Sequence, residues 1–202
     1  MLTQRLVLVL GLASIGLAAI GLAPSGATAQ MPGGGGTSRP VRLVVSGGLT
    51  VPAGDLKDLH DAGFHYDASL LLKFAGIPLT LRPEISFTRF NLKDALGSTA
   101  GGYGSGDVTQ MLGALGNIEV PLVGGLYAIA GGGVLNLKTP GAASGVDISQ
   151  SKLTFNAGAG LRFHMGGISG FLEGRAGTAS YDQGKFGFSK ATFIPVTFGL
   201  VF

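Results

Sequence analysis

The stretch ATFIPVTFGLVF, residues 191–202, carries the pattern that decides the fold. Its even positions are Thr192, Ile194, Val196, Phe198, Leu200 and Phe202, and its odd positions are Ala191, Phe193, Pro195, Thr197, Gly199 and Val201. Alternation with a period of two predicts a β-strand, because successive side chains of a strand point to opposite faces. One face of this strand is a continuous apolar stripe that ends on an aromatic residue.

Seven segments upstream carry the same kind of pattern. The predicted strands are 41–51, 63–75, 78–90, 108–121, 125–138, 152–165, 167–180 and 191–202. Tight turns are expected at 76–77, 122–124 and 166, whereas the connections 52–62, 91–107, 139–151 and 181–190 are long and polar. Short turns at one end, long loops at the other and an even number of strands are typical of a transmembrane β-barrel.

The composition favours the same class of protein. Charged residues make up only 12% of the chain, about half of the roughly 25% usual in soluble domains, and the mean hydropathy is +0.44. After residue 30, however, no apolar run reaches the ~18 residues of a membrane helix. A soluble barrel of the lipocalin type also alternates, but its water-facing stripe would carry more charge. We therefore predict an all-β fold, an eight-stranded antiparallel up-and-down transmembrane β-barrel.

Hairpin geometry predicts which residues lie opposite each other. The turn at 76–77 pairs Lys73 with Thr80 and Ser69 with Glu84. The turn at 166–167 pairs Gly160 with Glu173 and Gly158 with Arg175. The turn at 123–124 pairs Glu119 with Ala128 and Asn117 with Ala130. In all three hairpins, polar residues meet polar or small ones.

The polar stripe is predicted to fill the lumen, because an eight-stranded barrel is just wide enough for its own side chains. Charges in such a space must be paired, and we expect ion pairs among Arg82, Arg162, Arg175, Lys73, Asp67, Glu84, Glu119 and Glu173. Arg162 and Glu173 are diagonal neighbours, so they are the favoured pair. The other expected lumen residues are Arg42, Lys138, Asn117, Asn136, Asn156 and Thr197.

The first residues have the pattern of an export signal. Arg5 gives a positive start, 6–23 is apolar, and Ala27-Thr28-Ala29 is a small-x-small cleavage site. The predicted division is a cleaved signal peptide over 1–29, a flexible linker over 30–40 and the barrel over 41–202. An uncleaved membrane anchor is the alternative, which the break at Pro24 disfavours.

Four stretches of the chain resemble the small outer-membrane β-barrels, the OmpA/OmpX-like eight-stranded family. They are VSGGLTVPAGD (45–55), LRPEISFTRF (81–90), GAGLRF (158–163) and FGLVF (198–202). The resemblance implies a bacterial outer-membrane location and insertion by the barrel-assembly machinery, which recognises a final strand such as Phe198, Leu200 and Phe202. It implies no single activity, since members are structural proteins, adhesins or narrow channels.

Catalytic and metal-binding patterns are weak in this chain. His60, His65 and His164 are far apart, so no metal site is predicted, and the spacing of Asp55, Asp58 and Asp61 does not match a calcium loop. The predicted register brings Ser169 opposite His164, but a nucleophile also needs an oxyanion site and access to substrate. Two polar groups at a barrel rim are the simpler interpretation.

The functional prediction is therefore a non-enzymatic outer-membrane barrel whose external loops carry a structural or surface-interaction role. We expect a monomer in contact with outer-membrane lipid, without cofactor, metal or nucleic acid. One alternative is a narrow channel for small hydrophobic solutes, suggested by large apolar residues on the polar stripe: Leu71, Phe90, Leu115, Phe171 and Phe193. The other is a lipid-modifying barrel enzyme.

Overall fold

The computed structural model describes residues 40–93, 108–140, 147–186 and 189–202. Within these residues the strands are β1 (Val41–Ala53), β2 (Gly63–Lys73), β3 (Thr80–Asn91), β4 (Val108–Pro121), β5 (Leu126–Thr139), β6 (Ile148–Met165), β7 (Ile168–Ser180) and β8 (Lys190–Val201). Short helices α2 (Leu56–Leu59) and α4 (Gln183–Phe186) and the 3-10 turn η1 (Val123–Gly125) lie in the connections.

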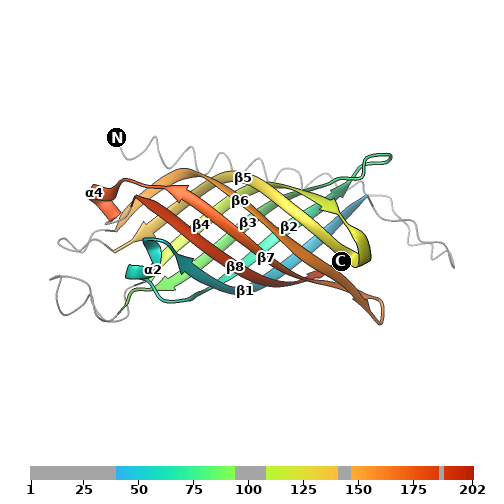
Figure 1. Cartoon of the computed structure of the whole chain (residues 1–202), viewed down its shortest axis with the longest axis horizontal. Helices are drawn as coiled ribbons and strands as arrows, with labels where there is room; N and C mark the ends of the chain where they lie inside the picture. The colour runs from blue at the N-terminus through green and yellow to red at the C-terminus, as the bar shows by residue number, and fades with distance from the viewer. Residues whose placement is uncertain (1–39, 94–107, 141–146, 187–188) are drawn as a thin grey trace, which may run out of the picture. The chain divides into compact units, whose positions relative to one another are not determined.

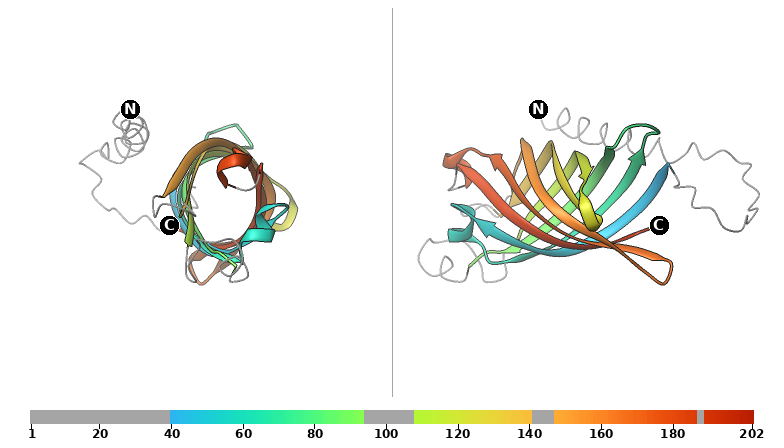
Figure 2. Two further views of the ribbon diagram at one scale, coloured as in Figure 1. Left: turned by 90° about the vertical axis from the view of Figure 1, so that its left-hand side faces the viewer. Right: turned by 45° about the vertical axis from the view of Figure 1, so that its right-hand side comes forward.

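In the described part of the chain, eight strands form one closed barrel in which each strand pairs antiparallel with its neighbours in sequence and β8 returns to β1. The strands run obliquely around the barrel, with α2 and α4 at one end and the tight turns at the other (Figure 1). Viewed from the helix end, the strands form a complete ring (Figure 2). The predicted fold class is confirmed.

Two of the three predicted hairpin registers are confirmed. Lys73 lies opposite Thr80, and Gly160 lies opposite Glu173. The β4–β5 register was predicted wrongly by one residue, since Glu119 lies opposite Ile129 and not Ala128. Asn117 correspondingly lies opposite Gly131 and not Ala130.

The extra residue is taken up in the turn between β4 and β5. Gly124 and Gly125 both have positive φ, 68° and 84°, which is a conformation that glycine adopts at little cost. The Leu122 N–H donates to the Leu126 carbonyl at 2.7 Å and closes the turn around η1. A turn one residue longer than predicted shifts the whole of β5 relative to β4.

This shift reverses the faces predicted for β5. Because side chains alternate, a slip of one residue moves each of them to the other side of the sheet. Lys138 and Asn136, predicted in the lumen, lie outside and are exposed or half-buried. Tyr127 and Ile129 take the inward positions, each 2% exposed.

Most of the outer surface of the barrel is apolar on the other strands, as the alternation predicted. On β8 the outward residues Ile194, Val196 and Phe198 are 41–50% exposed. The outward apolar residues of β1 are 46–52% exposed: Val41, Leu43, Val45, Leu49 and Val51. Large apolar side chains exposed on every side of a closed barrel are unusual for a protein surrounded by water.

The predicted signal peptide over 1–29 lies outside the described residues, as does the predicted linker over 30–40 except for Pro40. The Pro40 carbonyl accepts a hydrogen bond from the Lys73 N–H at 2.8 Å, beside the start of β1. Among the described residues, no helix has the length and apolar character needed to cross a membrane.

Candidate functional site

The centre of the lumen is an ion-pair network organised around Arg82. This inward residue of β3 is 1% exposed. Its guanidinium lies 2.9 Å from Glu173, 3.2 Å from Glu119 and 3.3 Å from Glu84, three carboxylates contributed by three different strands. Its Nε donates to Ser69 Oγ at 3.1 Å. One arginine therefore ties together β2, β3, β4 and β7.

Two further arginines balance the carboxylates. Arg175 donates to both oxygens of Glu84, at 2.9 and 3.1 Å, and its Nε lies 2.9 Å from Glu173. Arg162 pairs with Glu119. The three arginines thus match three glutamates, which is the condition under which buried charge is tolerated.

The structure does not form the favoured pair of Arg162 with Glu173. Arg162 pairs with Glu119 instead, because β5 turns Tyr127 into the lumen between Arg162 and Glu173. The Tyr127 hydroxyl donates to Glu173 Oε2 at 2.7 Å, and the Arg162 guanidinium lies over the Tyr127 ring, 4.8 Å from its centroid. Tyr127 was not identified from the sequence, since the predicted register placed it on the outside.

Gly160 makes room for this tyrosine. A Cβ atom on Gly160 would overlap the Tyr127 ring, from the hydroxyl to the ring carbons. The Tyr127 side chain therefore lies over the backbone of β6 only because residue 160 has no side chain.

The remaining residues predicted to form lumen ion pairs lie at the edges of the network. Asp67 is 6% exposed and contacts His65 at 3.5 Å and Ser46 at 3.4 Å. Lys73 is exposed at the turn end of β2, and no ion pair involving it is seen among the described residues. Arg42, at the same end, donates to Ser169 Oγ at 3.0 Å.

Apolar layers lie on both sides of the ion-pair network. Toward the tight turns, the buried layer consists of Val44, Leu71, Tyr127, Ile129, Phe171 and Val201. Toward the long connections, a second layer, here called the helix-end plug, consists of Leu56, Phe90, Met111, Leu135, Leu137, Ala179, Tyr181, Phe186 and Ala191. The plug includes Leu56 from α2 and Phe186 from α4, and the ring of Phe186 packs edge-on against Tyr181 at 5.4 Å.

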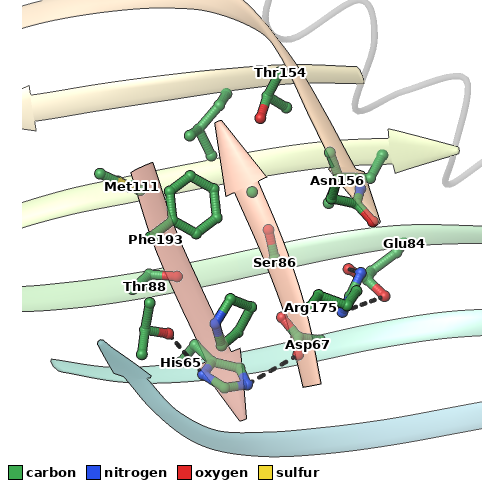
Figure 3. Close-up of a pocket in the computed structure, with 15 residues that line it drawn as sticks. His65, Asp67, Glu84, Ser86, Thr88, Met111, Thr154, Asn156, Arg175 and Phe193 are labelled. Carbon is green, nitrogen blue, oxygen red and sulfur yellow. Dashed lines mark hydrogen bonds and ion pairs between the residues drawn. The ribbon is translucent and has the colours of Figure 1, made fainter. Parts of the chain in front are cut away.

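A small cavity lined by both polar and apolar side chains lies between the network and the plug. Figure 3 shows His65, Asp67, Glu84 and Arg175 on one side of it and Met111 and Phe193 on the other. His65 is held from both ring nitrogens, by Thr50 Oγ1 at 2.9 Å and Thr197 Oγ1 at 2.9 Å. Every polar side chain in the figure comes from an inward strand position, so the cavity is an internal space of the barrel.

Of the two residues considered for catalysis, Ser169 is bonded to another side chain. His164 and Ser169 are opposite each other, as predicted, but Ser169 accepts its hydrogen bond from Arg42. His164 is exposed at the turn end of the barrel. Among the described residues, no group of three or more potential metal ligands comes together.

Comparison with solved structures supports the fold. The crystal structure of Neisserial surface protein A has a TM-score of 0.53 and 10% identity, covering 81% of this chain and 96% of that one. The N-terminal barrel domain of Pseudomonas aeruginosa OprF has a TM-score of 0.44, 11% identity and coverage of 81% and 98%. Ail of Yersinia pestis, solved with a heparin analogue, has a TM-score of 0.46, 14% identity and coverage of 81% and 100%.

The likeness to Neisserial surface protein A shows that the chain shares the fold of a small eight-stranded outer-membrane barrel. No protein-family model and no curated protein matches the chain.

Proposed function

We propose that this chain, which has the fold of the small eight-stranded outer-membrane barrels, is a bacterial outer-membrane protein with a structural or surface-interaction role. In this proposal the barrel anchors the protein in lipid, and the long connections at the helix end lie at the cell surface. The observation that carries it is the contrast between an apolar outside and a charged, buried inside. In water, burial would favour the opposite arrangement.

The apolar outer surface supports the membrane location. Leu153 and Phe155 on β6 are 68% and 63% exposed, and Tyr66 on β2 is 66% exposed. A closed barrel leaves no unpaired strand edge, so its backbone groups are satisfied in the absence of water. An exported protein of this kind also needs the signal peptide predicted over 1–29.

The filled lumen supports a structural role over the channel alternative. Of the five apolar residues that suggested a solute path, Leu115 and Phe193 line the small cavity. The other three belong to buried layers: Phe171 and Leu71 lie in the layer near the turns, and Phe90 lies in the helix-end plug. Between them, Arg82 and its carboxylate partners fill the cross-section. A solute would have to displace all three layers.

Heat-modifiable migration tests the membrane barrel. Purified protein folded into phosphatidylcholine vesicles should migrate faster on a gel before boiling than after, because closed barrels resist unfolding by detergent. It should also be recovered with the outer-membrane fraction of cells. A protein that stays soluble in the periplasm, with no shift on boiling, would contradict the proposal.

Conductance separates the structural role from the channel. In planar bilayers the folded protein should give no sustained current, because the ion-pair network and two buried apolar layers lie across the lumen. Stable solute-dependent flux would favour the channel. Barrel-assembly machinery and outer-membrane lipid are the partners that the proposal requires, and loss of Phe202 should slow assembly in cells.

A further inference from the structure

The outward face of four neighbouring strands carries a row of polar side chains toward the helix end. They are Arg89 on β3, Gln110 on β4, Asn136 and Lys138 on β5, and Ser149 and Ser151 on β6; this set is called the outer polar row. The backbone register makes it continuous, since Arg89 lies opposite Gln110, Gln110 opposite Lys138, and Lys138 opposite Ser149. Lys138 belongs to this row because the observed β5 register turns its side chain outward.

The row lies a similar number of residues from the turn end on each of the four strands. It begins ten residues from an exposed apolar residue there, namely Leu79 just before β3, Val120 on β4, Leu126 on β5 and Leu161 on β6, for Arg89, Gln110, Asn136 and Ser151. Ten residues rise about 33 Å along a strand, and a strand tilt of about 40° reduces this to about 25 Å along the barrel axis. That is the height of the apolar band of outer-membrane barrels.

At the turn end, large apolar side chains are exposed, including Phe74, Ile77, Leu122 and Val123. The exposed Lys73 and His164 at this end belong to the inward polar stripe of their strands and not to the outward stripe. If these apolar side chains mark one boundary of the bilayer, the outer polar row falls at the other, in the headgroup region of the outer leaflet.

The chemistry of the row fits a sugar phosphate. Arg89 and Lys138 are two strands apart, about 10 Å, so both can approach one anionic headgroup. Between and beside them are neutral hydrogen-bonding groups that match hydroxyls. Asn136 already bonds the hydroxyls of Ser149 and Ser151, at 3.0 and 2.9 Å, and all three remain accessible. The Lys138 ammonium lies 2.6 Å from Asp147, and both side chains are about half exposed, so the pair is open to competition by a phosphate.

The two cations of the row lie on one side of the barrel. The outward polar residues at the helix end of β7 and β8 include one cation: Thr178, Ser180, Lys190 and Thr192. On β1 and β2 the outward residues at the helix end are apolar, including Val51, Phe64 and Tyr66. On β8, which lies four strands away from β4 around the ring, Lys190 is exposed and lies opposite Ser180. A general attraction to anionic lipid would not require a cluster on one face.

We propose that the outer polar row binds the phosphorylated headgroup of an outer-leaflet glycolipid, with Arg89 and Lys138 holding phosphate and the Asn136–Ser149–Ser151 group holding sugar hydroxyls. This inference rests on the proposed membrane barrel.

Native mass spectrometry of the protein in dodecyl maltoside tests it, with diphosphorylated lipid A and its enzymatically dephosphorylated form as competing probes. Wild type should retain the phosphorylated form preferentially. R89Q/K138Q should bind it about thirtyfold more weakly, because each of the two cations contributes about one kcal/mol near a membrane surface. The matched control K190Q, which removes one cation on the opposite side, should change binding less than about twofold.

Equal retention of both lipids by wild type would overturn the inference without any variant. Equal losses for K190Q and the double variant would also overturn it, since they would show attraction to net charge alone. Both variants are first checked for the mobility shift on boiling. Absence of that shift in wild type would refute the membrane barrel itself, so the two failures are distinguishable.

Discussion

At the residue scale, Glu173 gives the most direct test of the ion-pair network in the lumen. Its carboxylate meets Arg82, Arg175 and the Tyr127 hydroxyl, all in the lumen. Without the charge of Glu173, the buried Arg82 and Arg175 each lose one carboxylate partner. We therefore expect E173Q to lower the free energy of unfolding by about 3 kcal/mol, measured by urea titration in lipid vesicles.

The matched control is D147N, which removes the half-exposed partner of Lys138. Exposed pairs contribute at most about 1 kcal/mol, so this variant should unfold close to wild type. Equal destabilisation by the two substitutions would show that the lumen network contributes no more than a surface pair.

A second residue-scale prediction concerns glycine. G160A should lower the free energy of unfolding by about 1–3 kcal/mol, because its methyl group would displace the Tyr127 ring. G174A is the control, since a Cβ there meets nothing within 4 Å. Stability measurements that rank the two in the opposite order would contradict the observed position of Tyr127.

Pairing of individual side chains was the part of the site that the sequence predicted least well. The charge-bearing residues could be listed, because polar inward positions alternate with apolar ones. Their partners could not, because Arg82 also bonds across the lumen to a strand that is not its neighbour. Arg82 and Glu173 are on β3 and β7, and no pattern along one hairpin indicates a contact across the barrel.

At the element scale, His60, the residue that follows α2, makes the stability of the helix-end plug depend on pH. The His60 ring is 3% exposed; its Nδ1 lies 3.3 Å from the Leu56 carbonyl and its Nε2 2.8 Å from the Thr109 hydroxyl. A carbonyl only accepts, so Nδ1 carries the proton and Nε2 accepts from Thr109 in the neutral ring. Burial lowers the pKa of His60 to about 4.

The pKa of His60 is about 4 in the folded protein and 6.5 in the unfolded chain. Between pH 4 and pH 6.5 the unfolded chain therefore binds more protons than the folded protein. The contribution of His60 is therefore fully present above pH 6.5 and is lost as the pH falls toward 4. By pH 5 the loss should be about 2 kcal/mol.

Urea titrations of wild type and H60N at pH 7.5 and pH 5 measure this difference. Titration of other groups is common to both proteins and cancels. Wild type should lose about 2 kcal/mol more than the variant between the two pH values. Parallel losses would mean that His60 is accessible to protons without opening the plug.

The elements themselves were predictable to different degrees. Strands with clean alternation, such as β3 and β8, were predicted with the correct faces. The fifth strand was not, because Gly131, Gly132 and Gly133 dilute its pattern and the turn before it was taken as one residue too short. The two glycines of η1 were the available signal, since paired glycines often mark a turn with positive φ.

At the scale of the whole molecule, the closed barrel followed from features that no single residue carries. Low charge, the absence of a long apolar run after residue 30 and the sorting of connections by length together predicted it. The helix-end plug could not be predicted, because Leu56 and Phe186 come from connections whose sequence is otherwise polar. They are drawn together by the need to cover the apolar end of the lumen.

The central claim is that lipid contacts the outward stripe and that the lumen is filled, and adjacent residues of β8 test it. The chain has no tryptophan, so I194W and F193W each supply a single probe at nearly the same depth. Ile194 points outward, 41% exposed, and Phe193 lines the internal cavity. In vesicles of brominated phosphatidylcholine, tryptophan at 194 should be strongly quenched and tryptophan at 193 much less. Equal quenching at both positions, or stronger quenching at 193, would contradict the account.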